Sequence, residues 1–286
     1  MPLRFAYHPG NVAHSSAPEV DETMRAACRS LDIELIDMPG ATSCGAGILG
    51  QANRRLQITL NARTMSIAED LGLDIITPCA TTAATLHEDL MMLKADPSLM
   101  GDVNRTLEKT TGRVLEGSIR IRHLLHVIVE DIGIENFSMK VKNPIPSPLG
   151  PYYGPNLQQD GLIGGDDVFD PWYMEGIIEA GGGKPVTYSS RTSSAGTPGI
   201  FAEEQTALRQ SANILFDAKA MGAKMVISAC TLAHGVLDIY QGKASRATGL
   251  NTNIPVIHFC EYVAFLTGNF PTRLAMLKTR VAVIGD

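Results

Sequence analysis

The feature of this sequence that most constrains its fold is an internal repeat. The first half carries the loop motif TSCGA, and the second half carries SSAGT at the matching place. In each half a helical pattern, a short apolar segment and a cysteine follow that motif. The same 34-residue interval separates Gly45 from Cys79 and Gly196 from Cys230. This agreement in order and spacing predicts two related domains.

Predicted strands and helices alternate along both halves. The expected strands are Leu3–Tyr7, Asp32–Met38, Leu73–Thr77, Lys184–Tyr188, Ala223–Ser228 and Ile254–His258. The expected helices are Glu19–Leu31, Asn53–Leu71, Thr82–Lys94, Ser118–Ile132, Trp172–Ala180, Glu204–Met221 and one that starts at Phe259. This alternation favours parallel β–α–β units. We therefore expect an α/β fold of two related Rossmann-like domains, each with a small parallel sheet flanked by helices, in a pseudo-twofold repeat.

Two details of this pattern matter for the site. The amphipathic helix expected over Ser118–Ile132 has no counterpart in the second half. The repeated loops all lie where strands end and helices begin, and ligands of such folds bind outside the carboxyl ends of the strands. We therefore expect the repeated loops to converge on one point in each domain.

A proline-rich stretch, Asn143–Gly150, divides the chain near its middle. Three prolines within five residues are not expected inside a helix or a central strand. We interpret the stretch 143–150 as a linker between an N-terminal domain over 1–142 and a C-terminal domain over 151–286.

Charge and hydropathy exclude several classes of protein. The net charge of −6 argues against a protein that binds nucleic acid through its phosphates. No apolar run approaches the roughly 18 residues that a membrane span needs. The first residues also lack the pattern of a signal peptide. We therefore expect a cytoplasmic protein with no membrane span and no nucleic-acid partner.

The cysteines are few and widely spaced. The five are Cys28, Cys44, Cys79, Cys230 and Cys260, and no Cys-x-x-Cys pair occurs among them. An odd number of scattered cysteines does not indicate a disulfide framework. The missing pair also argues against a zinc ribbon or a thioredoxin-type motif.

The repeated motifs carry a family resemblance. Around the loops stand TPCATT and SCG in the first half, and PYYGPN, SAG and IPVIHF in the second. Their order and spacing resemble the CCG domains of the heterodisulfide reductase B-type family. Members of that family carry one cysteine after the first strand, then Cys-Cys-Gly, then Cys-x-x-Cys, once in each domain. The resemblance implies the same two-domain fold and a role in thiol or disulfide redox chemistry at iron–sulfur clusters.

This chain departs from the family in its cysteines. Of the ten that the pattern would hold, only Cys44, Cys79 and Cys230 remain. The other positions hold Asn11, Ser43, Thr82, Pro155, Ser194, Ala195 and Ala233. A [4Fe–4S] cluster ordinarily needs four thiolates, so we do not expect the family's non-cubane clusters. A reduced iron–sulfur site, held by Cys44, Cys79 and Cys230 with other ligands, stays open.

The replacements differ between the halves. They are small and polar in the first half but mostly apolar in the second, so we expect an open site in the first half and a filled one in the second. Cys79 follows a strand and starts a helix, whose N-terminus favours a thiolate. Cys44 and Cys79 are therefore the candidate catalytic pair for dithiol–disulfide cycling or for persulfide chemistry. The alternative is that both are inert remnants of a lost cluster, and a lone Cys230 offers only a single thiol.

The remaining candidates favour structural roles. Cys28 and Cys260 lie in helical segments and are expected to pack as small apolar residues. His123 and His126, three residues apart, are expected to share a face of the amphipathic helix as packing or surface groups. The other side chains considered, all expected to be structural, are His8, His234, Asp166, Asp167 and Asp170.

The resemblance implies a component of a cytoplasmic heterodisulfide-reductase-like complex that handles thiol, disulfide or sulfane sulfur. It implies partners like the A-type and C-type components of that reductase, an intact B-type paralogue, and a thiol or persulfide substrate or carrier. The alternative is a non-catalytic structural component that keeps the fold without a cluster. A free-standing enzyme with an organic cofactor has no supporting motif here.

Overall fold

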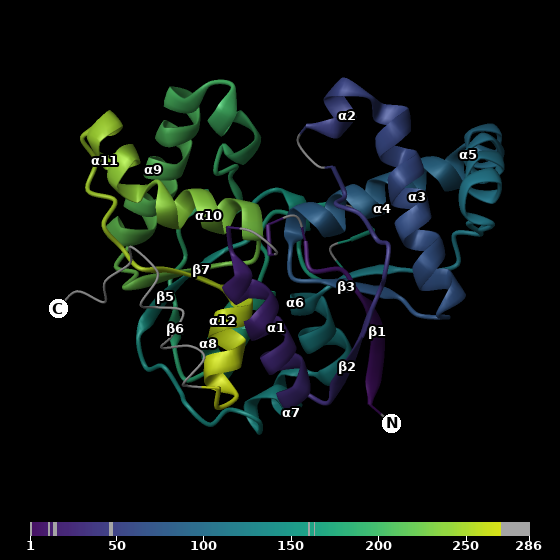
Figure 1. Cartoon of the computed structure of the whole chain (residues 1–286). Helices are drawn as coiled ribbons and strands as arrows, with labels where there is room; N and C mark the ends of the chain where they lie inside the picture. Colours follow the sequence, from purple (N-terminus) through teal and green to yellow (C-terminus); the bar gives the residue numbers. More distant parts are fainter. Residues whose placement is uncertain are drawn as a thin grey trace.

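Two four-stranded parallel sheets, one in each half of the chain, form the framework of the molecule (Figure 1). The computed structural model describes residues 2–10, 12, 13, 16–45, 48–159, 161, 162 and 164–269. The strand orders are β2-β1-β3-β4 and β6-β5-β7-β8, and every pairing is parallel. The two orders are identical when the second half is counted from its own first strand. The expected α/β fold with two similar halves is therefore confirmed.

The first half, in chain order, consists of β1 (Leu3–Tyr7), α1 (Pro18–Ser30), β2 (Ile33–Asp37), α2 (Leu49–Ala52), α3 (Arg54–Asp70), β3 (Ile75–Thr77), α4 (Ala80–Ala95), α5 (Pro97–Thr111), β4 (Ile121–His123), α6 (Leu124–His126), the π-helical η1 (Val127–Ile132) and α7 (Ile134–Ser138). Local signals set several of these bounds. Asn53 caps α3 by accepting from the Leu56 amide, and Asp96 caps α5 in the same way.

The second half consists of β5 (Pro148–Tyr152), the 3₁₀ turn η2 (Asn156–Gln158), α8 (Tyr173–Ala180), β6 (Lys184–Pro185), the 3₁₀ turns η3 (Ser189–Thr192) and η4 (Thr197–Phe201), α9 (Glu204–Ala220), β7 (Met225–Ser228), α10 (Thr231–Ile239), α11 (Gln241–Thr248), β8 (Val256–His258) and α12 (Phe259–Leu266). The sequence patterns had not indicated β5, α5, α10 or α11.

The predicted helix over Ser118–Ile132 was wrong. Its first part is the edge strand β4, and only the residues after His123 are helical. Ile119 and Ile121 are buried while Ser118 and Arg120 are exposed, which is the period of a strand. The segment β4–α6 therefore does have a counterpart, namely β8–α12, and the repeat extends to the fourth strand of each sheet.

The expectation that the proline-rich stretch excludes a central strand was also wrong. Pro148 begins β5, which lies between β6 and β7. Alternate residues of a strand turn their backbone groups to opposite neighbours. The carbonyls of Pro148 and Tyr152 accept from the β7 side, so Pro151 faces the β6 side, where β6 has already ended at Pro185. Its missing N–H therefore breaks no ladder bond.

The two halves share one hydrophobic core. Helix α1 of the first half packs against α12 of the second, and the two lie next to each other at the centre of Figure 1. Buried side chains from both halves, among them Met24 and Phe259, belong to one continuous cluster. The proposed division at 143–150 thus separates two sheets that are joined by a common core, and residues 270–286 of the second predicted domain lie outside the described part of the chain.

Candidate functional site

The equivalent cysteines of the two halves, Cys79 and Cys230, meet at the junction of the two sheets. Each follows the third strand of its own half, β3 or β7, and stands at the N-cap of the next helix, α4 or α10. Both have extended backbones, with φ, ψ of −108°, 112° for Cys79 and −130°, 122° for Cys230. The Ala80 amide at the start of α4 donates to the Ala229 carbonyl at 3.3 Å, so the starts of the two helices lie side by side.

The pKa values of the two thiols shift in opposite directions. Burial raises the pKa of Cys79, but hydrogen bonds from Cys230, Thr231 and Thr82 outweigh it and hold that pKa well below its usual range. The hydrogen bond to Cys79, burial and the charge on Cys79 together raise the pKa of Cys230 well above its usual range. Of the two sulfurs, Cys79 therefore favours the thiolate and Cys230 the thiol.

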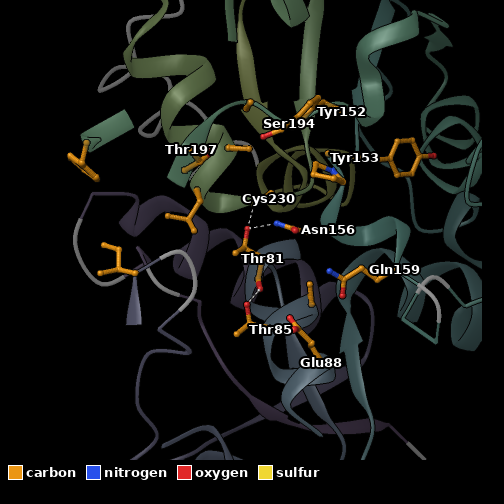
Figure 2. Close-up of a pocket in the computed structure, with 18 residues that line it drawn as sticks. Thr81, Thr85, Glu88, Tyr152, Tyr153, Asn156, Gln159, Ser194, Thr197 and Cys230 are labelled. Atoms are coloured by element: carbon orange, nitrogen blue, oxygen red, sulfur yellow. Dashed lines mark hydrogen bonds between the residues drawn. The ribbon is translucent and has the colours of Figure 1, made fainter. Parts of the chain in front are cut away.

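Threonine and asparagine side chains complete the surroundings of Cys230. The Thr81 hydroxyl lies 3.1 Å from the Cys230 sulfur and accepts a hydrogen bond of 2.8 Å from the Asn156 amide, as Figure 2 shows. Between the Thr81 hydroxyl and the Cys230 thiol, either group can be the donor. Thr81 belongs to the first half and Asn156 to the second, so this contact also crosses the junction.

A histidine at the end of the fourth strand supports each half of the pair. His123 Nδ1 accepts from the Leu125 amide at 3.2 Å, so its proton is on Nε2. Nε2 donates to the carbonyls of Pro78 at 3.0 Å and Ala229 at 2.9 Å, the residues that precede the two cysteines. His258 caps α12 in the equivalent way, since its Nδ1 accepts from the Cys260 amide. Burial lowers the pKa of both imidazoles, so they are neutral.

The interpretation of His123 and His126 as one helix face was therefore wrong. His123 ends a strand and bridges the two halves, whereas His126 lies within the helix that follows. Both are buried. The signal that could have found His123 is the parallel between IRH and VIH at the ends of the two edge strands.

Cys44, the other member of the predicted pair, lies on the far side of Thr82. Its sulfur is 3.5 Å from the Thr82 hydroxyl, which also hydrogen-bonds Cys79. The Asn61 amide holds the Cys44 carbonyl at 3.0 Å. Cys44, Cys79 and Thr82 have no exposed surface. A direct Cys44–Cys79 exchange stays a prediction, while His123 ties together the residues that precede Cys79 and Cys230.

The expectation of a filled second site was wrong. A cavity of about 360 Å³ opens at the loops of the second half (Figure 2), and Cys230 lies in its wall. Its walls include all of the second-half positions where the family pattern would place cysteine, namely Pro155, Ser194, Ala195, Cys230 and Ala233. In the first half a hollow of about 420 Å³ is lined in part by Gly10, Thr42 and Ser43, while the thiols of Cys44 and Cys79 are fully buried. The small apolar replacements leave a space that the neighbouring helices do not fill. These helices meet where Thr81 contacts Cys230, two residues that are 149 positions apart in the sequence.

The donor set does not fit the family's iron–sulfur clusters. Within the described residues, no three His, Cys, Asp or Glu side chains converge so that they could hold a metal ion. Around Cys79 the space is occupied by Gly10, Thr82 and Thr231. Asn11, which stands at the first cysteine position, lies outside the described residues.

The other predicted structural residues lie in the core or in turns. Cys28 and Cys260 both contact the Met24 sulfur, at 3.9 Å and 3.7 Å, and belong to the hydrophobic core, which confirms their packing role. Burial raises the pKa of Cys28 to about 12. His8 is buried, with Nε2 2.9 Å from the Thr42 carbonyl. His234 is buried between two carboxylates, 3.9 Å from Glu19 and 3.8 Å from Glu261.

The acidic loop before α8 is held by its own side chains. Asp166 accepts from the amides of Trp172 and Tyr173, and Asp167 accepts from those of Phe169 and Asp170. Asp170 forms an ion pair with Arg191. These contacts are those of a structural turn.

Within the described part of the chain, none of the helices combines the length and apolar character that crossing a bilayer requires.

Comparisons with known proteins extend over both halves. A family model described as the CCG cysteine-rich domain matches residues 5–87. The chain is 26% identical over 270 residues to the membrane anchor component of the 8-methylmenaquinol:fumarate reductase of Wolinella succinogenes, with 94% of this chain and 93% of that protein covered. It is 23% identical over 278 residues to the B component of the ferredoxin/F(420)H(2)-dependent CoB-CoM heterodisulfide reductase of Methanosarcina acetivorans, with 95% and 92% covered.

A solved structure also matches the fold. The crystal structure of a hypothetical protein from Helicobacter pylori superposes with a TM-score of 0.78 at 16% identity. The match covers 99% of this chain and 52% of that chain, so this chain spans about half of that structure's length. The likeness supports the α/β architecture with its two similar halves.

Proposed function

We propose that this chain is a redox component whose working group is the Cys79–Cys230 dithiol. The premise is that the chain is a member of the CCG-domain family of the heterodisulfide reductase B type. The chain would interconvert thiols and disulfides in a cytoplasmic heterodisulfide-reductase-like complex. The observation that carries the proposal is that the two cysteine-bearing helix starts converge: His123 hydrogen-bonds the carbonyls that precede both cysteines, and the Ala80 amide hydrogen-bonds the Ala229 carbonyl at 3.3 Å.

The sulfurs differ in a way that suits two-step exchange. Cys230 lies in the cavity wall, whereas Cys79 is fully buried behind it. An incoming disulfide R–S–S–R′ would therefore meet Cys230, which passes its proton to Cys79 and attacks as a thiolate. This step forms Cys230–S–S–R and releases R′–S⁻.

Cys79 then completes the exchange. The leaving thiolate takes the proton from Cys79 and departs as R′–SH, and the Cys79 thiolate attacks the Cys230 sulfur. The products are the Cys79–Cys230 disulfide and R–S⁻, so the two protein sulfurs lose two electrons and the substrate gains them. Turnover then requires a two-electron reductant, which a partner resembling the A-type or C-type component would supply. In the opposite direction the protein disulfide would oxidise two thiols.

Oxidation of the purified chain tests the proposal. The reduced protein is treated with bis(2-hydroxyethyl) disulfide, and the Cys79–Cys230 link is sought by peptide mass mapping. We expect one internal disulfide and two released thiols per chain. Cys79→Ser should stop at a mixed disulfide on Cys230, while Cys28→Ser, which removes only a core thiol, should behave as the parent.

Unreacted Cys79 and Cys230 in the folded protein would overturn the proposal. That result would leave the alternative, a structural component that keeps the fold while another chain carries the redox group. The proposal also includes sulfane sulfur as a substrate and an intact B-type paralogue as a partner. Co-purification from the native source with the products of neighbouring genes would test them.

A further inference from the structure

The cavity beside Cys230 is built almost entirely from uncharged groups. Its lining includes one carboxylate, Glu88 of α4, and within the described residues no lysine, arginine or histidine. Arg54 hydrogen-bonds Glu88 at 2.9 Å from outside the lining, but the same guanidinium also pairs with the buried Asp89 at 2.8 Å. One cation shared by two carboxylates leaves this edge of the cavity net negative.

The rest of the lining divides into a neutral polar wall and an apolar mouth. Thr81 and Thr85 lie one turn apart on α4, opposite Asn156 and Gln159 of the second half (Figure 2). Ile48 and Phe201, one from each half, are 70% and 84% exposed at the rim. Such a surface offers hydrogen bonds to hydroxyl and amide groups and contact to an apolar chain, but no counter-ion for an acid.

A substrate acid group would also meet charge that develops in the reaction. The attacking Cys230 sulfur becomes a thiolate in the wall of a cavity whose lining also contains Glu88. Like charges at short range repel more strongly in a partly open site than in bulk water, because less solvent screens them. An anionic disulfide would therefore meet this repulsion with no compensating cation.

We infer that the space left by the missing second-half cysteines is a substrate pocket that selects disulfides without anionic groups, with Glu88 as the residue that sets this charge preference. The inference rests on the proposed dithiol function and specifies its substrate class. A neutral molecule with short polar arms fits the volume of about 360 Å³.

Three small disulfides that differ in charge test the inference. The reduced full-length chain is mixed with bis(2-hydroxyethyl) disulfide, cystamine or dithiodiglycolate at low ionic strength. The rate of Cys79–Cys230 disulfide formation is divided by the rate of the same reagent with free 2-mercaptoethanol. We expect the normalised rate with dithiodiglycolate to be at least about tenfold below that with the neutral reagent, and cystamine to be no slower than the neutral one.

Glu88→Gln should reduce this discrimination about threefold, while Glu108→Gln, an exposed change on α5 away from the cavity, should leave it unchanged. Equal normalised rates for all three reagents would overturn the inference and leave the dithiol function standing. Unchanged discrimination in Glu88→Gln would overturn the role of that residue. Failure of every reagent to oxidise the pair would overturn the proposed function itself.

Discussion

His123, on the first sheet, donates a hydrogen bond of 2.9 Å to the carbonyl of Ala229, in the second half of the chain. The same Nε2 donates to Pro78, so one imidazole fixes the residues that precede both cysteines. The spacing of Cys79 and Cys230 is therefore set by a neutral side chain in the core and does not depend on the surface loops.

Replacing His123 tests this bridge. His123→Asn can still cap α6 by accepting from the Leu125 amide, but it is too short to reach both carbonyls. We expect the free energy of unfolding to fall by about 2 kcal/mol, since two buried carbonyls lose their donor. Urea denaturation measures the loss. If His123→Asn matched the parent in stability and in Cys79–Cys230 oxidation, the bridge would have no role.

The opposite pKa shifts of Cys79 and Cys230 predict an unusual titration. The pKa of Cys79 is well below the ordinary value for cysteine of about 8.5, because Cys230 and two threonines hydrogen-bond its sulfur. Ultraviolet thiolate absorbance should therefore reveal one thiolate in the neutral folded protein. Cys230→Ala removes a donor, so the titration should move to higher pH. Cys28 lies away from the pair. If Cys28→Ala also moved the thiolate titration to higher pH, the shift could not be assigned to the loss of the Cys230 donor.

Gly10 predicts a steric effect at the first site. Gly10 has a φ of +92°, and an added Cβ would lie 2.9 Å from the Cys79 Cβ. Gly72 has a φ of +65° but nothing within 4 Å of such a Cβ, so Gly72→Ala measures backbone strain alone. We expect Gly72→Ala to cost about 1 kcal/mol and Gly10→Ala about 2–4 kcal/mol, with slower Cys79–Cys230 oxidation only in the second. Equal losses would show that the site tolerates the methyl group.

Asp238 predicts a pH dependence of stability. Burial, with a smaller contribution from Glu261, raises its pKa from 3.8 to about 7. The folded state then holds a proton that the unfolded chain releases. This contribution to stability is fully present below pH about 3.8 and is lost as the pH rises to about 7. Asp238→Asn should remove that loss, so its stability relative to the parent should rise by on the order of 2 kcal/mol between pH 4 and pH 8. Parallel pH profiles of the urea midpoint for Asp238→Asn and the parent would contradict this prediction.

The sequence predicted most strongly what depends on local pattern. Strand β1 has the bounds expected from Leu3–Tyr7, and α3 and α9 start and end within one residue of their expected ends. The errors arose where one signal covered another. The alternating burial before Ile121 was concealed by the apolar helix that follows. The central strand β5 tolerates its prolines because Pro148 begins the strand and Pro151 turns its backbone to the side where β6 has ended.

The amino-acid sequence by itself determined the repeat, the α/β class and the position of Cys79 at a helix start, because these follow from spacing and periodicity along one segment. Only the tertiary structure decided that Cys79 faces Cys230 and that the second-half site opens onto a cavity. Both depend on how closely α4 and α10 approach across the junction. That distance is set by the packing of a core shared between the two halves, to which residues far apart in the chain contribute.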